Sequence, residues 1–98
     1  MNKRILSFLT ILVLFSFLLS GCYYFAARNE IKSAEKLTSD LKRAGGPTLV
    51  PYEYCSAESF LGMAKLETDQ SDWKHAKDFA SRSKSAAEAG LSEVQKKK

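Results

Sequence analysis

The stretch WKHAKDFASRSKSAAEAGLSEV, residues 73–94, decides the fold of this chain. Its apolar and small residues recur at intervals of three and four, the spacing that places side chains on one face of an α-helix. The members of this stripe are Trp73, Ala76, Ala80, Ser83, Ala87, Leu91 and Val94. Because most of them are small, helix axes can approach closely but each residue buries little area. We therefore expect a helix packed in a thin core.

The residues before this helix predict a helical hairpin. The polar segment TDQSD, residues 68–72, interrupts the periodicity just before Trp73. It offers three N-cap residues, Asp69, Ser71 and Asp72. A preceding helix is expected to begin near Ser56, which would be its N-cap. Its apolar face would consist of Ala57, Phe60, Leu61 and Ala64. The hairpin is thus predicted over about residues 56–95.

Another helix is expected over about residues 24–44. Its stripe consists of Ala27, Ile31, Ala34, Leu37, Leu41 and Ala44. Gly45 and Gly46 are suited to a left-handed C-cap, and a proline follows them. The segment PTLVPYEYC, residues 47–55, has two prolines and no helical period. An extended linker over residues 45–55 is therefore predicted.

The first 21 residues have the three parts of a secretory leader. Lys3 and Arg4 provide positive charge, an apolar run of 15 residues follows from Ile5 to Leu19, and small residues close it. This run is shorter than the roughly 20 apolar residues that span a bilayer. The alternative is an uncleaved anchor, lengthened by the apolar residues 23–26.

The four residues Leu19-Ser20-Gly21-Cys22 resemble the lipobox of bacterial lipoproteins. The resemblance implies cleavage between Gly21 and Cys22, a diacylglyceryl thioether on Cys22 and acylation of its new amine. A thiolate is the side-chain nucleophile best suited to such alkylation. Tyr23, where an aspartate would resemble an inner-membrane retention signal, favours the periplasmic face of the outer membrane. The alternative is that Cys22 is one more apolar residue of a signal anchor.

Two resemblances concern the part after the leader. Residues 60–83 resemble a single tetratricopeptide hairpin. Phe60, Met63 and Ala64 would lie on its first helix and the Trp73 stripe on its second. Glu67 departs from the pattern, and no second copy of the repeat is visible. Residues 52–56 and 71–76 resemble small alanine-rich envelope lipoproteins of unknown function, related to domains beside OmpA-like proteins. That resemblance implies no known activity.

The charge balance argues against a nucleic-acid partner. The chain has 15 basic and 11 acidic residues, a net charge of +4, and two of the cations belong to the leader. A nucleic-acid-binding domain usually has a strongly basic stripe. The basic residues Arg28, Lys32 and Lys36, together with Lys96 to Lys98, are candidates for contact with anionic lipid headgroups. The alternative is that they are solvated, because acidic residues interleave with them.

The other reactive side chains are few. Cys55 is expected to be a half-buried thiol packed against Tyr52 or Phe60, with an intermolecular disulfide as the alternative. His75 and Asp72 share a helix face, but two ligands do not make a metal site. Neither a catalytic residue nor a metal site is therefore predicted, and no cofactor other than the covalent lipid on Cys22.

These observations predict an all-α protein: a cleaved signal helix over residues 1–21, and a mature part over 22–98 that forms a small helical hairpin or three-helix bundle. The expected function is a non-enzymatic accessory or scaffold, lipid-anchored in the bacterial cell envelope, that binds another envelope protein through its hairpin. Phe60 and Trp73 are the candidate partner-binding residues, and the alternative is that both pack in the core, with Trp73 above Ala64 and Ala76. One alternative is a module that binds peptidoglycan or lipid headgroups, and another is a redox or hydrolytic enzyme based on Cys55.

Overall fold

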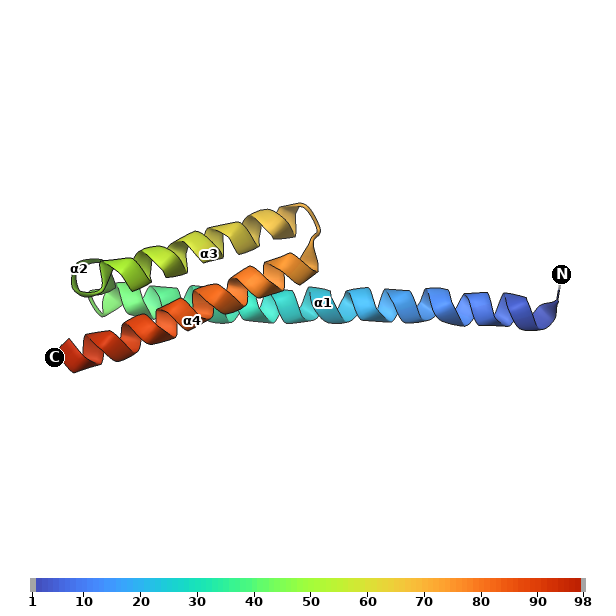
Figure 1. Cartoon of the computed structure of the whole chain (residues 1–98), viewed down its shortest axis with the longest axis horizontal. Coiled ribbons are helices and arrows are strands. Elements are labelled where there is room, and N and C mark those ends of the chain that lie inside the picture. The colour runs from blue at the N-terminus through green and yellow to red at the C-terminus, as the bar shows by residue number, and fades with distance from the viewer. Residues whose placement is uncertain (1, 98) are drawn as a thin grey trace.

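The computed structural model describes the backbone of residues 2–97, and the side chains of that range apart from residues 17–21. Four helices follow one another: α1 (Lys3–Arg43), α2 (Gly46–Leu49), α3 (Pro51–Asp69) and α4 (Trp73–Lys97). Helices α1 and α4 run in the same direction and α3 runs back between them in the chain (Figure 1). All three long helices contact one another. The predicted all-α fold is confirmed, and its form is a three-helix bundle.

Helix α1 continues without a break from the apolar N-terminal run into the bundle. The predicted helix over 24–44 is confirmed as its second half. The first half projects beyond the bundle (Figure 1), and residues 5–16 are exposed along it. Among the described residues, no helix has both the length and the apolar character needed to cross a bilayer.

The core consists of the three predicted stripes. Its buried apolar members are Ala27, Ala34 and Leu41 of α1, Ala57, Leu61 and Ala64 of α3, and Ala76, Ala80, Ala87 and Val94 of α4, with Val50 between α2 and α3. Ser83 is also buried, and its Oγ donates a hydrogen bond to the carbonyl oxygen of Ala57 at 2.6 Å. Leu41 and Val94 are the largest of the fully buried side chains. The prediction of a thin, alanine-rich core is confirmed.

The predicted linker over residues 45–55 is wrong, because most of it is helical. Pro47 lies in the first turn of α2 and Pro51 begins α3. A proline is tolerated there because the first N–H groups of a helix have no partner within it. The chain turns instead at Gly45, whose φ is 90°, and at Val50. Ser56, the predicted N-cap, therefore lies inside α3.

Gly90, which is not part of the predicted stripe, allows α4 to lie close to α1 and α3. A Cβ atom at this position would lie 2.7 Å from Cδ2 of Leu41 and 3.2 Å from Cβ of Glu53. Leu41 is fully buried, so its side chain has little room to move aside. A glycine inside a helix is otherwise unfavourable by about 1 kcal/mol relative to alanine. The close contact therefore explains why α4 contains a glycine here.

We expect Gly90→Ala to lower the free energy of unfolding by about 1–3 kcal/mol, because overpacking outweighs the gain in helix propensity. Gly62→Ala is the matched control, since a Cβ at Gly62 meets no atom within 4 Å. It should raise stability by about 0.5–1 kcal/mol. Urea titrations of both variants measure the difference. Stabilisation by both substitutions would show that α4 does not pack at Gly90 as described.

Candidate functional site

Cys22 lies where α1 leaves the bundle. Its thiol is exposed. The other three residues of the lipobox-like segment are Leu19, Ser20 and Gly21. The side chains of Leu19 and Ser20 and the surroundings of Gly21 are outside the described part of the structure. The first buried residue after Cys22 is Ala27, about 7.5 Å further along the helix axis. A substituent on Cys22 would therefore extend into solvent beside the end of the bundle without disturbing the core.

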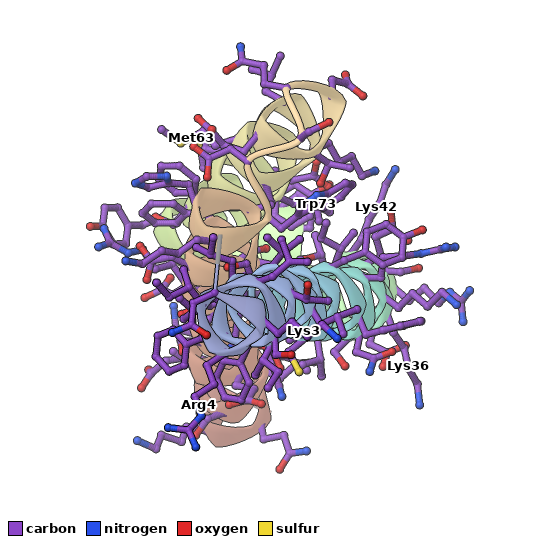
Figure 2. The ribbon with its side chains drawn as sticks, turned by 90° about the vertical axis from the view of Figure 1, so that its right-hand side faces the viewer. Lys3, Arg4, Lys36, Lys42, Met63 and Trp73 are labelled. Carbon is purple, nitrogen blue, oxygen red and sulfur yellow. The ribbon has the colours of Figure 1, made fainter. Side chains whose placement is uncertain are left out.

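Trp73 packs against the first helix at this same end of the bundle. Its ring is half-buried and meets the ring of Tyr24 edge-on, with the centroids 4.7 Å apart and an angle of 85° between the planes. Arg28 Nη1 donates a hydrogen bond to the hydroxyl of Tyr24 at 2.8 Å. The aromatic contact thus joins α4 to α1. Figure 2 shows Trp73 in the angle between α1 and the hairpin.

Phe60 belongs to a different aromatic pair. Its ring stacks on that of Phe79 in α4, with centroids 6.4 Å apart and planes 21° from parallel. Phe79 and Trp73 are six residues apart on α4, which places them about 120° apart around the helix. The two candidate partner-binding residues, Phe60 and Trp73, therefore lie on different sides of α4 and do not form one surface.

Beside Phe60, the outer side of α3 carries three exposed apolar side chains. Tyr52, Met63 and Leu66 are 78%, 43% and 61% exposed, and we call them the α3 strip. In Figure 2 Met63 projects from the outer edge of the hairpin. Tyr52 and Met63 are eleven residues apart, close to three full helical turns, so they share one face. Helical periodicity does not reveal this strip, because it identifies the residues that face the core.

Asp72 caps α4, and His75 is held by that cap. One carboxylate oxygen of Asp72 accepts from the backbone N–H of His75 at 3.3 Å, and the other lies 2.7 Å from its Nδ1. The bond to His75 is the main reason that the pKa of Asp72 is below its ordinary value. Glu67 adds a third potential metal ligand, since one ligand atom from each residue lies within 4.8 Å of the others. Capping of an exposed helix end accounts for this arrangement of Asp72 and His75.

Cys55 is exposed, so the prediction of a half-buried thiol is wrong. It lies on the side of α3 away from the core, because the buried Ala57 and Leu61 are about 160° and 120° from it around the helix. Cys55 is near the start of α3 and His75 near the start of α4, at opposite ends of the antiparallel hairpin (Figure 1). The fold therefore does not bring these two reactive side chains together.

The basic residues singled out in the sequence lie on two separate helices. Arg28, Lys32 and Lys36 are exposed on α1, as expected. Lys96 and Lys97 end α4 on the far side of the bundle from the N-terminal run (Figure 1). Lys97 Nζ donates to the carbonyl oxygen of Leu49 at 2.8 Å there. Lys96 and Lys97 therefore do not share a surface near the anchor with Arg28, which agrees with the alternative that they are solvated, and Lys98 is outside the described residues.

No family model, curated protein or solved structure matches the chain.

Proposed function

We propose that this chain is a lipid-anchored protein of the bacterial cell envelope, held at the periplasmic face of the outer membrane through Cys22. The observation that carries the proposal is the coincidence of a leader ending in Leu19-Ser20-Gly21-Cys22 with an exposed Cys22 just outside the bundle. A diacylglyceryl group there would be free to enter a bilayer. Each buried methylene contributes about 0.8 kcal/mol, so two or three acyl chains suffice for stable attachment.

The role that we propose for the anchored bundle is a non-enzymatic scaffold that docks another envelope protein on the hairpin. The support is the α3 strip of Tyr52, Met63 and Leu66, which is exposed along the outside of the helix. Exposed apolar residues gathered on one face are typical of interaction surfaces. Phe60, half-buried on Phe79, would form the edge of this surface. A partner with an amphipathic helix could lay its apolar face along the strip.

A role without catalysis agrees with the separation of the reactive groups. Cys55 and His75 lie at opposite ends of the hairpin, and His75 is engaged by Asp72. Nucleophilic catalysis by a thiol requires a base within hydrogen-bonding distance. The alternative role, binding of peptidoglycan or lipid headgroups, has structural support at the end near Cys22, where Tyr23, Lys74 and Lys77 line a groove.

The docking surface can be tested by photo-cross-linking in intact cells. A photoreactive residue at Met63 is expected to give a discrete cross-linked product, because Met63 lies in the α3 strip. Ser85, exposed on α4 away from the strip, is the matched control position and should give little product. Leu66→Asp, introduced beside the photoreactive residue, should reduce the yield at least about fivefold through the cost of desolvating a charge.

Mass spectrometry of the product then identifies what was captured. A cross-link to one other envelope protein supports the scaffold. Equal yields from Met63 and Ser85, or cross-links only to a second copy of this chain, would reject the proposed role of the strip without bearing on the lipid at Cys22.

A further inference from the structure

A groove lies directly beside Cys22, between α1 and the start of α4. Tyr23 lines one side, and residues of the first turns of α4 line the other; its volume is about 380 Å³. The α4 side consists of Lys74, His75, Lys77, Asp78 and Ser81. The groove thus presents two ammonium groups, together with hydroxyl groups from each side. These are groups that bind phosphate oxygens.

Lys74 and Lys77 lie near the end of α4 where the helix dipole does not favour positive charge. They lie in the first two turns of α4, and cations are unfavourable at a helix N-terminus because of the helix dipole. By contrast, Lys42 and Arg43 end α1, and Lys96 and Lys97 end α4, where the dipole favours positive charge. Lys74, in the first turn, therefore lowers the stability of α4, whereas the dipole effect is small at Lys77 in the second turn. A ligand with negative charge would account for both lysines.

The acidic residues nearest to these lysines are already paired. Asp72 binds His75 at 2.7 Å, and Asp78 lies 3.3 Å from Arg82 Nη2. Among the described residues, Lys74 and Lys77 take part in no ion pair. Two ammonium groups are therefore available at the mouth of the groove.

The position of the groove indicates what the ligand is. Tyr23 immediately follows Cys22, so acyl chains on Cys22 would place the groove at the level of the phospholipid headgroups. Tyr24 and Trp73 pack together at the same end of the bundle. Tyrosine and tryptophan are the residues that favour the boundary between lipid and water.

We infer that the groove between Tyr23 and the first turns of α4 receives the phosphate of a membrane phospholipid, with Lys74 and Lys77 as its cationic contacts. This inference rests on the proposed anchoring at Cys22. It gives the anchored bundle a fixed orientation: the α3–α4 turn faces the bilayer, and the C-terminal end of α4 points away from it (Figure 1). The lipid on Cys22 would hold the protein at the membrane, and phosphate binding in the groove would fix its orientation there. We call this orientation the seated state.

Trp73 provides the test, because it is the single tryptophan of the chain and lies next to Lys74. The full-length protein, purified from cells, is reconstituted into vesicles of phosphatidylglycerol and brominated phosphatidylcholine, and quenching of Trp73 fluorescence is measured. Wild-type protein should be quenched. Lys74→Gln/Lys77→Gln should retain less than about half of that quenching, since each lysine near an anionic surface favours the seated state severalfold.

The control is Lys96→Gln/Lys97→Gln, which removes the same charge at the other end of α4 and should leave the quenching unchanged. The groove variant should also melt at the wild-type temperature or slightly above it, because it removes cations from a helix N-terminus. Equal quenching in both double variants would overturn the inference. The mass of the purified protein separates the two hypotheses: without lipid on Cys22 the anchoring proposal fails, whereas lipidated protein with lysine-independent quenching rejects the groove alone.

Discussion

Leu41→Ala is expected to lower the free energy of unfolding of the bundle by about 2–5 kcal/mol, the range for removing a fully buried leucine. The effect should be large because Leu41 is fully buried and packs with Val50 and Val94 where most of the core is alanine. A core in a domain of this size supplies only about 3–5 kcal/mol. Loss of Leu41 should therefore leave a substantial fraction of the molecules unfolded.

Fluorescence of Trp73 is the appropriate measurement for this variant, followed during a urea titration of the full chain. Trp73 reports on the bundle because it contacts Tyr24 across the α1–α4 interface. Circular dichroism would be less specific, since the exposed residues 5–16 are also helical. Leu66→Ala is the matched control, because Leu66 is exposed and should change stability by less than about 0.5 kcal/mol. Similar urea midpoints for the two variants would contradict the assignment of Leu41 to the core.

Cys22→Ser is expected to abolish lipid attachment completely and to leave a precursor with its leader intact. A serine hydroxyl is not appreciably ionised near neutral pH, whereas a thiol is partly ionised and its thiolate is a strong nucleophile. Mass spectrometry of protein from membranes measures both changes, as loss of the lipid mass and retention of residues 1–21. The bundle itself should still fold, because Cys22 is exposed and precedes the first buried residue, Ala27.

Cys55→Ser is the control for this experiment, since it makes the same chemical change at the only other cysteine. Cys55 is exposed on α3, so its replacement should disturb neither processing nor folding. The mass of the wild-type protein purified from cells tests the lipoprotein proposal. A mass that includes the complete leader and no addition on Cys22 would reject it.

Helical periodicity was sufficient to predict the buried faces of this protein. The stripes through Ala27 and Leu41, through Ala57 and Leu61, and along α4 from Ala76 to Val94 all face the core. The same method failed at Pro47 and Pro51, because a proline marks the start of a helix as readily as the end of one. It also passed over Gly90, whose role depends on a contact with Leu41 from another helix.

The candidate sites were less predictable because they depend on how the helices are arranged. Cys22 could be identified from a continuous run of four residues. The groove combines Tyr23 with Lys74 and Lys77, which are about fifty residues away, and only the parallel alignment of α1 with α4 brings them together. For the same reason, the sequence alone could not show that Phe60 and Trp73 lie on different sides of α4. It also could not show that Lys96 and Lys97 lie at the end of the bundle away from the N-terminal run.

If the leader is cleaved as proposed, the unbroken course of α1 would make processing and folding compete in time. The bond between Gly21 and Cys22 lies inside this helix. A peptidase that binds its substrate in an extended form can reach the bond only while that turn of the helix is unwound. Once Ala27 is packed in the bundle, only about one turn separates the held part of α1 from the bond, and unwinding becomes harder. A leader cut before the bundle forms would avoid this barrier, so variants that fold more slowly should be processed at least as fast as the wild type.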